Sequence, residues 1–208
     1  MRAGPLPDEL FRRQDESADG EFYAIPRFVT HIDPETIDAL TQVYRERLPA
    51  GGRVLDLMSS WVSHLPPEVA YERVSGLGMN LAELQANRRL TDLVVHDLNA
   101  EPELPYPDES FDAVVNAVSV QYLTRPVEVF ASVARVLRPG GFSLVAMSHR
   151  LFPTKAIAAF HAMPPPRRVQ LVMTYHELSA GFGKPKLMDR SPQDADPLWV
   201  VLAQRPPA

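Results

Sequence analysis

The 208-residue chain contains no cysteine, and this absence excludes several kinds of chemistry at once. Without a thiol there is no disulfide, no thiolate metal ligand and no cysteine nucleophile. The 6 histidines are scattered along the chain, and none is paired with another at the spacing of metal ligands. We therefore expect no metal site.

Clustered positive charge and long apolar runs are missing too. The formal net charge is -5 at pH 7, and basic residues occur as isolated pairs such as Arg88-Arg89 and Arg167-Arg168. Neutralising phosphates requires a clustered basic surface, so we expect no nucleic-acid partner. No apolar run approaches the roughly 20 residues of a membrane span. The N-terminus has no apolar core of a signal peptide, so we expect a cytoplasmic protein without a membrane partner.

The composition that remains is that of an ordinary globular protein, with 45% hydrophobic and 23% charged residues. The length suits one domain with a sizeable core, and no repeat or linker divides the chain. We expect a flexible segment over 1–20, because it is polar and unpatterned, and a single domain over 21–208. Within that domain we expect a lid over 21–50, a binding core over 53–150, and helices and edge strands over 151–208. The domain would act as a monomer or homodimer.

Short apolar runs alternate with helical patterns along most of the chain, and this alternation predicts a doubly wound parallel α/β sheet. Asp33 followed by Pro34 predicts one helix start, and Asn80 predicts another. Pro66 suggests a further short helix. We predict strands over 54–57, 71–77, 93–96, 111–116 and 142–147, helices over 126–137 and 168–178, a possible strand over 184–188 and a final edge strand over 198–203.

The chain is organised around the stretch from Arg53 to His64. Residues 54–57 read as a short buried strand that carries one acidic side chain, Asp56. A buried carboxylate is costly unless it meets hydrogen-bond donors, so we expect Asp56 to order the loop that follows. That loop should leave the carboxyl end of a central parallel strand, where open α/β sheets bind their ligands.

This stretch resembles the first motif of the class I S-adenosylmethionine-dependent methyltransferases, Val-Leu-Asp-Leu-Gly-Cys-Gly-Thr-Gly. Residues 54–57 match the motif, whereas its three glycine positions hold Met58, Ser60 and Val62. Glycine permits positive φ and a close approach of the backbone to a ligand. Either the loop takes an ordinary backbone path and binds through residues 59–61, or the pocket has been altered.

Two later segments carry the same resemblance. Residues 97–115 look like the middle of small-molecule methyltransferases of the type 11-like group, and residues 135–141 look like their turn into strand five. Residues 23–33, 56–64 and 147–150 resemble a branch of the family with a glycine-poor first motif. The resemblance implies a Rossmann-like, mostly parallel seven-stranded sheet with an antiparallel final strand. It also implies S-adenosylmethionine as cofactor, S-adenosylhomocysteine as product and a small-molecule acceptor.

The resemblance also assigns binding roles. Asp97 matches the acid that accepts from the adenine amino group, and Leu98 would pack on the ring. Gly78 stands where the family places an acid that holds the ribose hydroxyls, which leaves Asn80 nearby as a substitute. The other positions expected at the cofactor are Tyr23, Arg27, His31, Asp56, Met58, Ser59, Ser60, Trp61, Met79, Asn99, Asn116, Ala117 and Val118.

Several of these residues have two readings. Tyr122 and His64 are the candidate catalytic bases, which are needed only if the acceptor must lose a proton, but His64 also suits the polar end of a short helix. Trp61 can face the cofactor sulfonium by cation–π attraction or lie in the core. Arg27 suits the cofactor carboxylate as a bidentate donor, whereas its aromatic neighbours suit packing of the lid.

His149 and Arg150 follow the fifth predicted strand, at the edge of the sheet that binds ligands. They suit an acidic acceptor or the lining of the pocket. Alternatively, they form an ion pair with the acid-rich connection that precedes the fourth predicted strand.

Two classes of function fit the sequence. The first is methyl transfer from S-adenosylmethionine to a small molecule, chemistry that proximity and a dry pocket largely supply. The second is a non-catalytic S-adenosylmethionine- or nucleoside-binding protein on the same fold, motivated by the missing glycines and ribose acid. A nicotinamide-dependent oxidoreductase is disfavoured, because its pyrophosphate needs a Gly-rich turn at a helix N-terminus.

Overall fold

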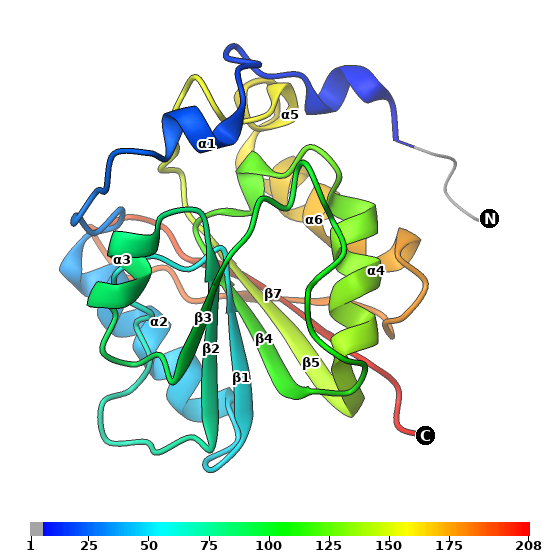
Figure 1. The fold of residues 1–208 in the computed structure, drawn as a ribbon. Coiled ribbons are helices and arrows are strands. Elements are labelled where there is room, and N and C mark those ends of the chain that lie inside the picture. Colours follow the sequence, from blue (N-terminus) through cyan, green and yellow to red (C-terminus); the bar gives the residue numbers. More distant parts are fainter. Residues whose placement is uncertain (1–5) are drawn as a thin grey trace.

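The computed structural model describes residues 6–208, which fold around one seven-stranded sheet (Figure 1). The strand order is β3-β2-β1-β4-β5-β7-β6, with β7 antiparallel to both of its neighbours and the pairs from β3 to β5 parallel. This confirms the predicted Rossmann-like sheet with an antiparallel final strand. The strands are Arg53–Leu57 (β1), Arg73–Gly78 (β2), Asp92–Val95 (β3), Phe111–Ala117 (β4), Leu137–Met147 (β5), Lys186–Asp189 (β6) and Trp199–Gln204 (β7).

Helices cover both faces of the sheet (Figure 1). Successive strand residues point to opposite faces, so the sheet has two apolar cores. Val54 and Leu144 pack with the helix α2 on one face, whereas their neighbours Leu55 and Val145 pack with α4 and α6 on the other. The helical segments are Asp8–Phe11 (η1), Asp19–Phe22 (α1), Pro34–Arg47 (α2), Leu81–Ala86 (α3), Val120–Tyr122 (η2), Pro126–Val136 (α4), Ala158–Ala162 (α5) and Pro165–Leu178 (α6).

Local signals set the starts of two helices as predicted. The Asp33 carboxylate accepts a hydrogen bond from the Thr36 N–H at 3.0 Å, with Pro34 at the first helical position of α2. The Asn80 side chain accepts from the Glu83 N–H at 3.1 Å and begins α3. Each cap satisfies an N–H group that the helix leaves without an internal partner.

The helix predicted after Pro66 is wrong, because residues 67–68 form only a turn. The two prolines supply no N–H donors there, and the Arg89 guanidinium donates to the carbonyls of Pro66 and Val69 at 3.3 and 2.8 Å. The start of β5 also differs from the prediction. The strand begins at Leu137, directly after α4, and Gly140 adopts a φ of 81° within it.

The sequence predicts that the last strand forms an edge of the sheet, and this prediction is wrong. β7 lies between β5 and β6, so β6 forms the edge. The burial of the two strands explains the order: Val200 and Val201 of β7 are fully buried, whereas three of the four residues of β6 are exposed. A strand with apolar residues on both faces is stable only when it is covered on both faces.

The segment over 1–20 was expected to be flexible, and residues 1–5 of it lie outside the described residues. Residues 13–19 are not loosely draped over the surface. Asp19 is 6% exposed and pairs with Arg13 at 2.6 Å, and Lys155 contacts both Asp15 and Asp19. The prediction missed this packing because the lysine lies far along the chain.

Candidate functional site

Of the three glycine positions in the loop after β1, Met58 keeps a backbone conformation typical of glycine, whereas Ser60 and Val62 do not. Met58 adopts a φ of 60°, in the left-handed region that non-glycine residues rarely occupy. The next N–H, that of Ser59, donates to the Leu77 carbonyl at 2.7 Å, which ties the loop to β2. The alternative of an ordinary backbone path is therefore wrong at Met58.

Asp56 orders this loop, as the sequence analysis expected. Its Oδ2 atom accepts hydrogen bonds from the hydroxyls of Ser59 and Ser63, each at 2.6 Å. Burial raises the pKa of the Asp56 carboxyl to about 6, and the two serine hydroxyls limit the rise. The Asn87 amide extends the network, because it donates to Ser63 Oγ at 2.8 Å and to the Ser60 carbonyl at 2.9 Å.

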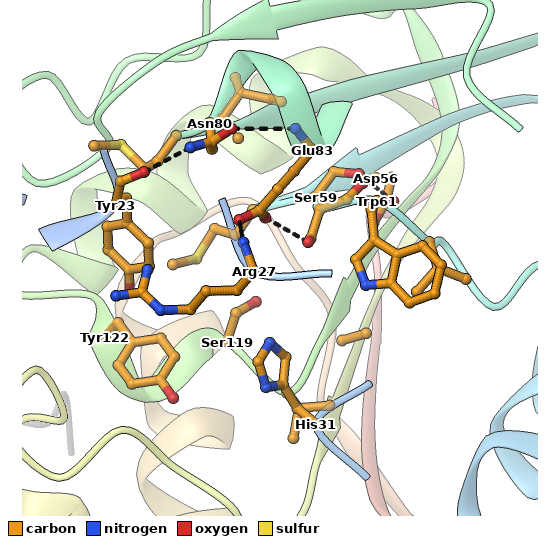
Figure 2. Close-up of a pocket in the computed structure, with 18 of the residues that line it drawn as sticks. Tyr23, Arg27, His31, Asp56, Ser59, Trp61, Asn80, Glu83, Ser119 and Tyr122 are labelled. Carbon is orange, nitrogen blue, oxygen red and sulfur yellow. Dashed lines mark hydrogen bonds between the residues drawn. The ribbon is translucent and has the colours of Figure 1, made fainter. Parts of the chain in front are cut away.

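A cavity opens beside this loop at the carboxyl ends of β1, β2, β3 and β4 (Figure 2). This is the edge at which the strand order reverses between β1 and β4, and such a crevice is where open α/β sheets bind ligands. Of the predicted site residues, the following line it: Tyr23, Arg27, His31, Asp56, Met58, Ser59, Ser60, Trp61, His64, Gly78, Met79, Asn80, Asp97, Leu98, Asn99, Ala117, Val118 and Tyr122.

Asn116 is the exception, and its assignment to the cavity is wrong. The side chain is buried, and its Nδ2 atom donates to the Leu57 carbonyl at 3.1 Å. It lies beneath the sheet edge because side chains alternate along β4, and the lining residues of that segment are Ala117, Val118 and Ser119.

Asp97 follows β3, and its carboxylate stabilises the turn that comes directly after it. Its Oδ1 atom accepts from the N–H groups of Asn99 at 2.9 Å and Ala100 at 3.3 Å. A carboxylate has two oxygens, so Oδ2 is available to accept from a ligand. Leu98 is buried in the core beneath and still lines the cavity, which leaves it placed to pack on a flat ring.

Arg27 of the predicted lid (residues 21–50) lines the cavity, but its guanidinium group hydrogen-bonds to other residues of the lid. The group donates to the Phe22 carbonyl at 3.0 Å and the Ile25 carbonyl at 3.3 Å, and it stacks 4.4 Å above the Phe22 ring. Trp61 faces the lid from the other side, where its indole N–H donates to the Val29 carbonyl at 3.0 Å. Trp61 is half-buried at the cavity wall, so the alternative of a core residue is wrong.

Glu83 is the acidic residue that the sequence analysis missed. Its carboxylate lines the cavity and accepts from the Arg27 N–H and from Ser60 Oγ, each at 2.6 Å (Figure 2). Within residues 6–208 no cation lies within ion-pair distance of it. Asn80, the expected substitute for the ribose acid, is used otherwise: it caps α3 and its amide donates to the Tyr23 carbonyl at 2.8 Å. The signal in the sequence was the acid three residues after a helix cap.

Gly78 shows why no acid projects from the end of β2. A Cβ atom at this position would lie 2.2 Å from the Ser59 carbonyl oxygen. The loop after β1 therefore occupies the space that a side chain at position 78 needs, and the acid of the cavity comes from α3.

Burial favours the neutral forms of two imidazoles and one phenol of the cavity. Burial, together with a smaller effect of nearby His31, lowers the pKa of His64 to about 4. Burial also lowers the pKa of His31, which Glu83 partly offsets. Burial raises the pKa of Tyr122 to about 12, and its hydroxyl accepts from the Phe152 N–H at 2.8 Å. Tyr122 therefore stays protonated, and both imidazoles are free to accept a proton.

His149 and Arg150 pair with an acid outside the cavity. The His149 imidazole lies 2.9 Å from the carboxylate of buried Asp196, and Arg150 Nε donates to both of its oxygens at 2.9 and 3.0 Å. Arg150 thus forms an ion pair, but its partner is Asp196 and not an acid of the predicted connection. Neither residue lines the cavity.

Two features are absent from residues 6–208. No group of three or more His, Asp or Glu side chains is arranged to hold a metal ion. No helix in this part of the chain combines the length and the apolar character needed to cross a membrane.

The fold and its edge cavity are those of an open α/β sheet that binds a ligand at its switch point. Comparison with known proteins adds to this. A family model described as a methyltransferase domain matches residues 59–145. The 27-O-demethylrifamycin SV methyltransferase of Amycolatopsis mediterranei (strain S699) is 27% identical over 226 residues, which cover 97% of this chain and 83% of that protein.

Solved structures give the same fold. The cyclase SpnF superposes with a TM-score of 0.62 at 18% identity and covers 82% of each chain. An S-adenosylmethionine dependent methyltransferase from Mesorhizobium loti superposes with a TM-score of 0.55 at 19% identity, over 81% of this chain and 100% of that chain. In the sequence of its middle part and in its fold, the chain is thus similar to S-adenosylmethionine-dependent methyltransferases.

Proposed function

We propose that this protein transfers a methyl group from S-adenosylmethionine to a small-molecule acceptor bound in the edge cavity. The observation that carries the proposal is the convergence of family motif positions on one cavity: the ordered loop after β1, Asp97 after β3 and Ala117 at the end of β4 all line it. Methyl transfer needs the donor and acceptor aligned in a dry pocket more than it needs a reactive side chain. The Amycolatopsis relative, named for a small-molecule substrate, supports an acceptor of this kind.

The residues of the cavity suit the parts of the cofactor. Asp97 Oδ2 would accept from the adenine amino group, with Leu98 against the ring. Glu83 would accept from the ribose hydroxyls, because its two protein donors leave lone pairs free on both oxygens. The loop from Met58 to Trp61 would seat the methionine part, and the indole face of Trp61 favours a sulfonium.

His64 and Tyr122 would serve the acceptor. A hydroxyl acceptor loses a proton as it is methylated, and neutral His64 can accept it, whereas Tyr122 is protonated at pH 7 and cannot act as the base. A base with a pKa of about 4 is weak. The site therefore favours an acceptor with an acidic hydroxyl, such as a phenol, over an aliphatic alcohol.

The first test is binding of the cofactor. S-adenosylhomocysteine at a hundredfold excess over its Kd stabilises the folded protein by about 2.7 kcal/mol. For a chain of this size each kcal/mol raises Tm by about 2–4 °C, so we expect a rise of about 5–11 °C in a thermal unfolding scan. Adenosine diphosphate ribose, which lacks the amino-acid tail, is the matched control and should give a smaller shift. An unchanged Tm at millimolar S-adenosylhomocysteine would contradict the proposal.

The second test separates catalysis from binding alone. The protein is incubated with S-adenosylmethionine labelled in its methyl group and with a panel of phenols, carboxylic acids and aliphatic alcohols. We expect label in an extracted acidic acceptor, and less of it with His64→Ala. Cofactor binding without transfer to any acceptor of the panel would favour the alternative, a non-catalytic S-adenosylmethionine- or nucleoside-binding protein on this fold.

A further inference from the structure

A buried lysine lies outside every motif of the binding core. Lys155 precedes α5, and its side chain is fully buried. Its Nζ atom donates to the Ser17 carbonyl at 2.7 Å and lies 3.2 Å from Asp15 Oδ2 and 3.3 Å from Asp19 Oδ1. The Phe22 ring centroid is 5.6 Å away. An ammonium group enters such a site only with partners that offset its lost hydration.

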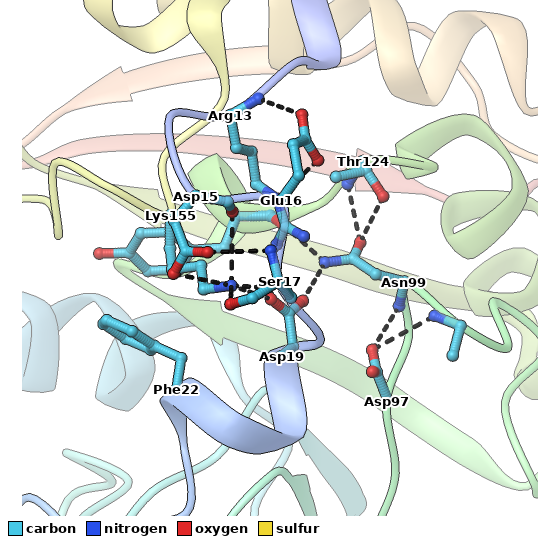
Figure 3. Close-up of polar contacts among 12 residues, drawn as sticks. Arg13, Asp15, Glu16, Ser17, Asp19, Phe22, Asp97, Asn99, Thr124 and Lys155 are labelled. Carbon is cyan, nitrogen blue, oxygen red and sulfur yellow. Dashed lines mark hydrogen bonds and ion pairs between the residues drawn. The ribbon is translucent and has the colours of Figure 1, made fainter.

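All of these partners belong to residues 13–23, which we call the N-terminal strap (Figure 3). The strap lies above the carboxyl ends of the strands (Figure 1). Two of its residues, Asp19 and Tyr23, line the edge cavity, so the strap forms one of the cavity's walls. Lys155 does not line the cavity itself. It affects the shape of the cavity through the strap residues that it holds.

Asp19 connects the lysine to the loop after β3. Its Oδ1 atom pairs with Lys155 and with Arg13, at 3.3 and 2.6 Å. Its Oδ2 atom accepts from Asn99 Nδ2 at 2.7 Å (Figure 3). The Asn99 N–H in turn donates to Asp97 Oδ1 at 2.9 Å. A continuous chain of charge-assisted contacts thus runs from Lys155 to the carboxylate expected at the adenine.

We propose that Lys155 and Asp19 are positioning residues for the cofactor: their ion pair holds the strap against the Asp97–Asn99 loop and so fixes one wall of the nucleoside site. This inference rests on the proposed function only for the identity of the nucleoside. Breaking the pair should let the strap open locally while the sheet stays folded, because few other buried contacts tie residues 13–18 to the domain.

The experiment compares Lys155→Met, Asp19→Asn and the double variant with the wild type. Methionine matches the length of the lysine stem, and asparagine keeps an oxygen for Asn99. Lys186→Met is the matched control, since Lys186 is exposed on the edge strand β6. S-adenosylhomocysteine is the probe, and its Kd and dissociation rate are measured by stopped-flow or surface plasmon resonance. Trypsin cleavage after Arg12 and Arg13 reports the position of the strap without any ligand.

We expect each single variant to raise the Kd and the dissociation rate about tenfold or more and to speed trypsin cleavage of the strap. Addition of the second substitution should change the Kd less than twofold, because the first has already broken the pair. With an active acceptor, the KM for the cofactor should rise while kcat changes less than twofold, a split that general destabilisation does not produce. Circular dichroism confirms that the compared samples are folded, and Asp19→Asn carries the test if Lys155→Met does not fold.

Wild-type Kd and wild-type cleavage rates in folded Asp19→Asn would overturn the proposal, as would independent effects of the two substitutions in the double variant. Failure of the proposed function looks different. In that case the wild type itself would not bind S-adenosylhomocysteine, whereas the cleavage experiment would still show whether the pair holds the strap.

Discussion

Replacement of Asp56 by asparagine tests the physical account of the loop after β1. Burial raises the pKa of this carboxyl from 3.8 to about 6, so the native state binds a proton more tightly than the unfolded state. The stability that protonation provides is fully present below pH 3.8 and is lost as the pH rises through about 6. At about 1.36 kcal/mol for each pKa unit, the full difference is about 3 kcal/mol. Asparagine does not titrate and lacks this dependence.

The measurement is the free energy of unfolding by urea, for wild type and Asp56→Asn, at pH values from 5 to 8. Between pH 8 and pH 5 the wild type should gain about 1.4 kcal/mol relative to the variant, since only the part of the titration above pH 5 is sampled. Buried His176, whose pKa burial lowers to about 4, has the opposite effect on stability, but it is common to both proteins and cancels in the difference. A stability difference that does not change with pH would refute the reasoning.

Three further substitutions test neighbouring contacts. Asp97→Asn keeps an acceptor for the turn but replaces the other oxygen by a donor; we expect S-adenosylhomocysteine to bind about 10–100-fold more weakly by calorimetry, with Tm unchanged within 2 °C, from the loss of a charged hydrogen bond. Gly78→Ala sets a Cβ 2.2 Å from the Ser59 carbonyl oxygen, and urea unfolding should show a loss of about 1–3 kcal/mol, whereas Gly20→Ala, with no atom within 4 Å of its Cβ, should show none. Tyr122→Phe leaves a buried N–H without its acceptor and should cost about 1–3 kcal/mol in the same assay. Complete loss of methyl transfer in a folded Tyr122→Phe protein would contradict our assignment of the proton to His64.

The features that the sequence predicted are those whose cause is local or periodic. The caps at Asp33 and Asn80 lie within three residues of the N–H groups that they satisfy. Asp56 was recognisable because a lone acid in an apolar strand needs donors nearby. The order of β6 and β7 was not recognisable, since a period-two pattern shows which strands are covered on both faces but not which strands they pair with.

The missed residues act across long separations in the chain. The carboxylate of Glu83 meets an N–H 56 residues away, at Arg27, and Lys155 meets a carbonyl 138 residues away, at Ser17. Neither residue belongs to a motif of the family, and the local pattern around each is satisfied by a helix or a turn. Only the fold brings these side chains to the cavity or to its wall, so their roles could be inferred only after the sheet was in place.

The loop after β1 therefore holds Met58 in a left-handed backbone conformation by a balance of energies that glycine would not need. A non-glycine residue in the left-handed region costs on the order of 1–3 kcal/mol, which Met58 must meet from its surroundings. The two serine hydroxyls on Asp56 and the Ser59 N–H on β2 offset that cost, since each buried hydrogen bond contributes about 1 kcal/mol. Glycine residues would make this loop flexible, whereas the hydrogen bonds of the serine hydroxyls restrict its conformation. A loop fixed before the cofactor arrives loses less conformational entropy on binding, so the absence of glycine is compatible with tight seating of the methionine tail.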